Sequence, residues 1–164
     1  GIVIHTVIHA ARPDVHCIAH THTNAGMAIA CQQDGLRTDN FYSALLHNRI
    51  AYHDFEGITV FDDEKPRLVN NLGEKSLLIL RNHGLLACGR SIPEAFQGLW
   101  AMERACEVQV TTDSTGKPNV PVGDEVLAKA EQLMAMQAMG APAGDLEFNA
   151  FTRLIENIDP SYKD

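Results

Sequence analysis

The chain has 164 residues, of which 45% are hydrophobic and 21% charged, the balance of a globular domain with a buried core. Its formal net charge of −8 argues against a nucleic-acid partner, because binding to a phosphate backbone requires a basic stripe. No apolar run approaches the roughly 18 residues of a membrane span, so no membrane partner is expected either.

Cysteine usage indicates a reducing compartment. None of the four cysteines forms a C-x-x-C pair and each lies in an apolar stretch; they are Cys17, Cys31, Cys88 and Cys106. We therefore expect four buried, reduced thiols in a cytoplasmic protein. The chain starts at Gly1, directly in an apolar segment, so an N-terminal part is expected to be missing.

The first part of the chain alternates predicted helices and strands. Turn residues and apolar spacing predict helices over residues 2–11, 24–33 and 38–47, a strand over 15–21 and short β-like pieces over 50–61. Pro13 ends the first helix, and Asn24 is the expected N-cap of the second. This alternation favours an α/β layered domain with a parallel sheet.

The second part is richer in helices. The expected elements are a helix over 65–72 closed by Gly73, strands over 77–80 and 85–88, a helix from Ser91 to about Val110, a loop over 111–122, and helices over 124–139 and 145–158. The strongest signal is the capping box of Ser91 and Glu94 ahead of an apolar stripe at three- and four-residue steps. A helical C-terminal appendage is therefore predicted.

Three of the eight histidines form a candidate metal site. His20 and His22 alternate at the end of the strand predicted over 15–21, so both imidazoles leave the same face. His83 follows the strand predicted over 77–80 and precedes a glycine, and strand ends of α/β sheets are common ligand positions. The alternative without a metal site is that the H-x-H pair occurs by chance on a half-exposed strand. Three imidazoles accept zinc, manganese, iron, cobalt or nickel.

The other histidines considered are weaker candidates for a functional role. His5 and His9 share one helical face, but the intervening residues lack the glutamate of a zinc-protease H-E-x-x-H motif, so packing roles are expected. His16 is expected to be structural. His53 is a candidate proton carrier or a surface residue.

Four motifs together resemble the class II aldolase/adducin family, and they cover residues 2 to about 112. The motifs are ARPDVHCIAHTHTNAG, AYHDFEG, LRNHGLLACGRSIPEAF and ERACEVQV. The resemblance implies a three-layer α/β/α fold around a mostly antiparallel sheet, which replaces the parallel sheet expected above. It also implies zinc held by His20, His22 and His83, and a homotetramer with sites between subunits. The ending IDPSYKD resembles the extension of bacterial adducin-like members.

The domain boundaries follow from the same resemblance. Residues 1–112 are expected to form the metal-binding domain without its N-terminal part, and residues 113–164 a loop and helical extension of that domain. The family's catalytic glutamate, also a metal ligand, precedes the H-x-H motif by 19 residues, a position that falls on Gly1. The family's phosphate-binding loops lie upstream of Gly1, so a sugar-phosphate substrate is not carried over.

Two functions are compatible with these features. The first is a metal-dependent aldolase-type lyase that acts on a small hydroxy-carbonyl or sugar-derived substrate through an enediolate, with Tyr42, His53 and Asp54 as candidate proton carriers. Epimerisation and decarboxylation share that intermediate. The alternative is a non-enzymatic, adducin-like scaffold with a vestigial metal site. Only that alternative makes actin an expected partner.

Overall fold

Four strands form one mixed sheet in the order β1–β4–β3–β2. Their bounds are β1 Cys17–Thr21, β2 Ile50–His53, β3 Leu77–Leu80 and β4 Gly84–Gly89. β4 is antiparallel to both β1 and β3, whereas β2 and β3 are parallel. The mostly antiparallel sheet is therefore confirmed, and the parallel sheet expected from the alternation of elements is wrong for two of the three pairings. The structure is a computed structural model that describes residues 2–57, 64–140 and 142–163.

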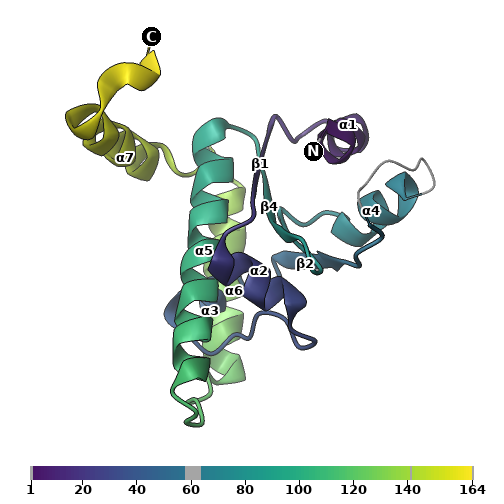
Figure 1. Ribbon diagram of the computed structural model, residues 1–164, viewed down its shortest axis with the longest axis vertical. Coiled ribbons are helices and arrows are strands. Elements are labelled where there is room, and N and C mark those ends of the chain that lie inside the picture. Colours follow the sequence, from purple (N-terminus) through teal and green to yellow (C-terminus); the bar gives the residue numbers. More distant parts are fainter. Residues whose placement is uncertain (1, 58–63, 141, 164) are drawn as a thin grey trace.

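Helices cover both faces of this sheet, as the three-layer expectation requires (Figure 1). One face carries α1 (Ile2–Ala11) and α4 (Lys65–Leu72). The other carries α2 (Asn24–Cys31), α3 (Phe41–Leu45) and the long helix α5 (Ile92–Ser114). Each face has its own apolar cluster, so the sheet is buried from both sides.

The central strands show why a double-faced core forms. Every residue of β3 and β4 is buried. Successive side chains of a strand point to opposite faces. Leu78 and Leu80 accordingly join the cluster under α1 and α4, while Leu77 and Ile79 join the cluster under α5. A continuous apolar run is the pattern of a strand covered on both sides, and it predicted β3 at its observed bounds.

The C-terminal third is helical, as predicted. Ser91 caps α5 by accepting the Glu94 backbone N–H at 3.2 Å, and α5 continues past Val110 to Ser114. α6 (Asp124–Ala138), α7 (Asp145–Ile158) and a short 3-10 helix (Pro160–Lys163) follow. α7 projects from the body in Figure 1 and contacts it through aromatic rings, such as Phe148 at 5.5 Å from Phe96. No helix among the described residues is long and apolar enough to cross a bilayer.

Several local predictions need correction. The N-cap of α2 is Thr23, not Asn24, since the Thr23 hydroxyl accepts the Gly26 N–H. The helix predicted over 38–47 is shorter, because the Asn40 side chain caps α3 and starts it at Phe41. The 3-10 helix at the C-terminus was not expected. The part of the β-like prediction that falls on residues 58–61 lies outside the described residues.

The cysteines are all free, but they are not all buried. Cys88 and Cys106 are buried, and burial raises their pKa values to about 11 and about 12. Cys17 is half-buried and Cys31 is exposed at the end of α2, so the expectation of four buried thiols is wrong for these two.

Gln109 on α5 is a fully buried polar side chain that holds the loop after α2. Its Oε1 accepts the Arg37 backbone N–H at 2.8 Å. Its Nε2 donates to the Gly35 carbonyl at 2.9 Å and to the Gln32 side chain at 3.0 Å. Buried polar groups of this kind are stabilising only while every partner is satisfied, so Gln109 ties the loop to the helix.

Replacing Gln109 by Leu should therefore destabilise the chain by about 1–3 kcal/mol, because the Arg37 N–H and the Gly35 carbonyl lose their partners. Urea unfolding followed by circular dichroism measures the change. Gln132→Leu, on the exposed surface of α6, is the matched control and should shift the free energy by less than about 0.5 kcal/mol. Equal effects of the two substitutions would contradict this role of Gln109.

Candidate metal centre

Three imidazole rings meet at the edge of the sheet where β1 ends and β4 begins. His20 lies in β1, His22 follows that strand, and His83 lies in the turn between β3 and β4. One ring nitrogen from each residue lies within 4.8 Å of the others. The ring centroids are 4.5 Å apart for His20 and His22, and 4.9 Å for each pair with His83. The structure thus brings together the three residues that were predicted as ligands.

The proton position on His20 is determined by the backbone. Its Nδ1 lies 2.7 Å from the Leu85 carbonyl oxygen, which can only accept, so Nδ1 carries the proton. The lone pair of Nε2 consequently faces the cluster, where it lies 2.8 Å from Nε2 of His22. A hydrogen bond from the second ring nitrogen to a backbone carbonyl is the usual way to orient a metal-binding imidazole.

Glu103 on α5 holds the segment on both sides of His22. The Thr21 hydroxyl donates to Glu103 Oε1 at 2.6 Å, and the Thr23 hydroxyl donates to Oε2 at 2.6 Å. His22 itself is exposed, so its own packing does not position it. The two anchored threonines instead restrict the backbone from which its ring projects.

Glu103 did not emerge from the sequence as a functional residue. One signal was available, since Glu103 lies four residues after Leu99 and therefore on the sheet-facing side of the predicted helix. A carboxylate on that side needs a polar partner, and the alternating threonines around His22 supply it.

Gly84 permits the close approach that places His83 beside His22. A Cβ atom at this position would lie 2.2 Å from the Thr21 carbonyl oxygen and 3.1 Å from the His22 ring. The turn before it is tight, with Asn82 at φ +54° and the His83 N–H donating to the Leu80 carbonyl at 3.0 Å. Only glycine fits between the two strands here.

The electrostatics of the cluster favour neutral imidazoles. Burial lowers the pKa of His20, and the neighbouring His22 and His83 lower it further, against the opposing effect of the Leu85 hydrogen bond. Burial and the charge of His22 also lower the pKa of His83. Neutral imidazole is the form that donates a lone pair to a metal ion, so these shifts suit a ligand set.

The donor set also fits a single divalent ion in size. Two nitrogens bound to one tetrahedral zinc lie roughly 3.3 Å apart, given Zn–N bonds of about 2.0–2.1 Å. The His20–His22 separation of 2.8 Å is slightly shorter, and His22 is exposed and free to open it. Three nitrogens without a carboxylate would leave the ion its full positive charge.

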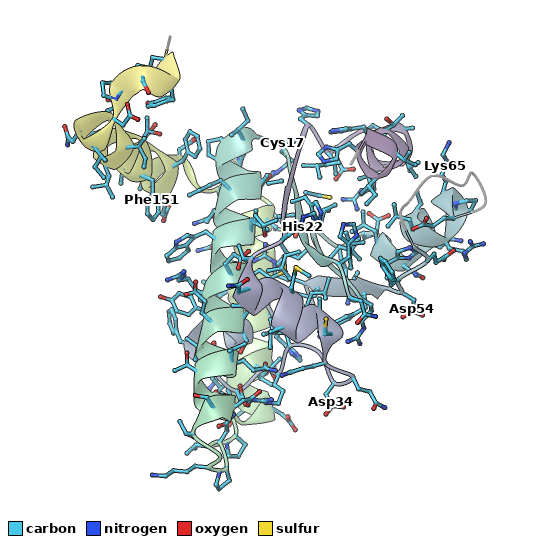
Figure 2. All side chains as sticks on the ribbon, in the orientation of Figure 1. Cys17, His22, Asp34, Asp54, Lys65 and Phe151 are labelled. Atoms are coloured by element: carbon cyan, nitrogen blue, oxygen red, sulfur yellow. The ribbon has the colours of Figure 1, made fainter. Side chains whose placement is uncertain are left out.

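Two of the candidate proton carriers, His53 and Asp54, lie at the end of β2. His53 is only 3% exposed; its Nδ1 accepts from Asn71 at 2.9 Å and its Nε2 donates to the buried Glu64 at 3.2 Å. Asp54 is exposed, and Figure 2 shows it on the α4 side, apart from His22. His53 is therefore not the surface residue considered as an alternative.

The third candidate carrier, Tyr42, packs in the helical layer. Its ring lies 5.8 Å from Trp100 of α5, and the adjacent Phe41 is 73% exposed. No ring contact joins Tyr42 to the three histidines within the described part of the chain. The glutamate position that falls on Gly1 lies outside the described residues.

The remaining histidine pair packs on the neighbouring helix. The rings of His5 and His9 on α1 lie 6.4 Å apart, and His9 Nδ1 donates to the Val15 carbonyl at 2.9 Å. This bond ties α1 to the entry of β1, in keeping with a packing role for His9.

The sequence and the fold match one family. The family described as Class II Aldolase and Adducin N-terminal domain matches residues 1–110, and the chain belongs to it. A solved structure of an aldolase II superfamily protein from Pseudomonas syringae is similar with a TM-score of 0.91 and 42% identity, over 100% of this chain and 65% of that one. L-fuculose 1-phosphate aldolase from Glaciozyma antarctica is similar with a TM-score of 0.78 and 26% identity, over 98% of this chain and 59% of that one.

The curated relatives of this chain include both aldolase-like proteins and adducins. An aldolase class 2 protein of Pseudomonas aeruginosa is 38% identical over an alignment of 165 positions that covers 99% of this chain and 64% of the relative. Alpha-adducin of Rattus norvegicus is 40% identical over an alignment of 169 positions that covers 96% of this chain and 23% of the adducin. The chain thus spans less than two thirds of the length of these relatives.

Gly84→Ala should disturb both the fold and the histidine cluster. The added methyl group would lie 2.2 Å from a backbone oxygen, so β1 and β4 must separate, at an expected cost of about 1–3 kcal/mol. Denaturant unfolding reports the cost, and NMR contacts between the His20, His22 and His83 rings report the loss of the cluster. Gly123→Ala, where a Cβ meets nothing within 4 Å, should leave both unchanged. Retention of the ring contacts in Gly84→Ala would refute this role.

Proposed function

We propose that this chain carries the metal centre of a class II aldolase-type lyase that acts on a small hydroxy-carbonyl or sugar-derived substrate. The observation that carries the proposal is the convergence of three histidine nitrogens within 4.8 Å. His20, His22 and His83 would hold one divalent ion, with zinc as the first choice and manganese, iron, cobalt or nickel as alternatives. A bound ion would supply Lewis acidity, which stabilises negative charge on a substrate oxygen.

The protein's own residues prepare this site. The Leu85 carbonyl fixes the His20 tautomer, and Glu103 anchors the backbone on both sides of His22. The exposed side of His22 leaves room for a small substrate to approach. Asp54 is exposed to solvent but lies apart from His22 in Figure 2, so it could exchange a proton with the site only through solvent, and His53, whose ring is 3% exposed, could do so only through its partners.

The proposal extends to assembly. We propose a homotetramer, as the resemblance to the sugar-phosphate aldolases of the family implies. The 73% exposed Phe41 beside Tyr42 would suit a subunit contact, through which Tyr42 could serve a neighbouring site.

A second candidate function is an adducin-like interaction protein with a vestigial metal site. The observation that favours it is the 40% identity to alpha-adducin over 96% of this chain, a stronger likeness than the 26% identity to L-fuculose 1-phosphate aldolase. In that case the histidine cluster would be an inherited feature, and actin would be the expected partner.

Metal binding is the first test. The purified chain should bind about one equivalent of zinc or cobalt in isothermal titration, because three imidazole nitrogens are already gathered within 4.8 Å. His20→Ala/His22→Ala should weaken binding by on the order of 100-fold or more, since two ligands are lost. His16→Ala removes an exposed histidine outside the cluster and should leave the affinity unchanged. Equal metal affinity of the double variant and the wild type would contradict the proposed metal site.

Catalysis is the second test and separates the two candidate functions. The metal-loaded chain is assayed for release of aldehyde or carbon dioxide over a panel of hydroxy-ketones and keto-acids. The lyase proposal expects turnover that disappears when a chelator removes the metal and returns on re-addition. If no compound of the panel is turned over at saturating metal, and the chain co-sediments with actin filaments, the result would instead support the scaffold function.

A further inference from the structure

A second candidate site lies at the end of the sheet opposite to the histidine cluster. A cavity of about 510 Å³ is lined there by Val15 before β1, Leu77 at the start of β3 and Gly89 at the end of β4. The α6 residues Met134 and Ala135 form another part of the wall. At about 3.4 Å per residue, the length of β4 separates this cavity from the histidines by roughly 17 Å.

Arg49 is the unusual group of this cavity. Its only side-chain hydrogen bond within the described chain runs from Nη1 to the Met134 sulfur at 3.6 Å, and a thioether is a weak acceptor. No described carboxylate lies within ion-pair distance of it. Arg49 lines the cavity, and among the described residues its other side-chain nitrogens are not fully buried atoms without a partner, so solvent reaches them. Burial lowers the pKa of Arg49, as expected of a poorly hydrated guanidinium.

Within the described chain, the acidic residues of the cavity form no ion pair with Arg49, and most of them already have other partners. Three of these acids have the following partners: Asp14 pairs with Arg12 at 2.7 Å, Glu94 pairs with Arg90 at 2.7 Å, and Glu131 accepts from Asn48 at 3.0 Å. Glu74, the fourth acid of the wall, is exposed to solvent. The cavity therefore presents a partly desolvated cation that forms no ion pair within the described residues, because Glu94, the acid whose charge acts on it, is paired with Arg90.

Further donors and an apolar wall surround the guanidinium. The Ser76 hydroxyl and the His47 imidazole are half-buried in the lining and have no side-chain hydrogen bond within the described residues. Ala135 and Ala138 of α6, with Met134, provide apolar surface on one side. A ligand that satisfies both parts must carry an anionic head and a short hydrocarbon body.

We propose that this cavity binds a small organic monocarboxylate, with the carboxylate paired to Arg49 and the hydrocarbon body against α6. A guanidinium pairs with a carboxylate through two parallel hydrogen bonds, which Arg49 has the free donors to make. Inorganic phosphate fits less well, because it offers nothing to the apolar side of the cavity. The proposal does not depend on metal binding or on catalysis at the histidine cluster.

Butyrate is the probe. Titration of the full chain should shift the Met134 methyl resonance in a saturable way, whereas butanol, which lacks the charge, and inorganic phosphate, which lacks the hydrocarbon, should not. Arg49→Met should weaken butyrate binding by about tenfold or more. Arg153→Met removes an exposed arginine on α7 and should have no effect.

Two further variants keep the test decisive. Ala135→Leu fills the cavity from the exposed surface of α6 and should also weaken binding, even if Arg49→Met unfolds the chain. His20→Ala/His22→Ala should bind butyrate as wild type does, which excludes binding at the histidine cluster. The proposal is overturned if butyrate causes no saturable shift, if Ala135→Leu leaves the affinity unchanged, or if butanol or phosphate binds equally well.

Discussion

The close approach of β4 to β1 at Gly84 is the constraint on which the histidine cluster depends. The absence of a side chain lets the backbone of Gly84 lie against the Thr21 carbonyl, where a Cβ atom would be only 2.2 Å away. Two consequences follow from that contact. His83 is brought beside His22, and the next residue, Leu85, directs its carbonyl at His20 Nδ1. One missing side chain therefore determines both the position of the third imidazole and the tautomer of the first.

The sequence predicted the parts of this site that depend on local periodicity. Alternation along a strand placed His20 and His22 on one face, and the end of an apolar strand followed by glycine located His83. The bounds of α1, α4 and β3 were also predictable, because proline, glycine and continuous apolar runs mark them in the sequence itself.

What could not be predicted depends on contacts between distant segments. Thr23 and Asn24 are both good N-caps, and the choice of Thr23 accompanies its hydrogen bond to Glu103, which lies 80 positions along the chain. The sequence predicted His53 as a surface residue or a proton carrier. It could not show the burial of His53, because that burial arises from α4, which supplies Asn71, and from the pairing of β2 with β3. The local sequence pattern around Thr23 and around His53 contains neither of these long-range contacts.

The sheet separates two kinds of chemistry at its two ends. At one end, neutral imidazoles with lowered pKa values present lone pairs and would attract a cation. At the other, a guanidinium without a carboxylate partner would attract an anion. Both ends of the sheet depend on the same double-faced core. β3 and β4 are buried along their whole length, so they hold the two ends at a fixed separation.

This arrangement explains how one domain can serve both aldolase-like and adducin relatives. The elements that stabilise the fold, the apolar strands and the stripe of α5, do not require a bound ion, because they bury their side chains in two apolar clusters that contain no histidine among the described residues. A relative could therefore lose metal chemistry without losing the domain. The supports of the imidazoles are more informative about function than the fold is. The Leu85 hydrogen bond orients His20 for a ligand role, and the Glu103 contacts restrain an exposed loop that the core does not hold. In this chain both supports are intact, and for that reason the metal-dependent function is the better supported of the two.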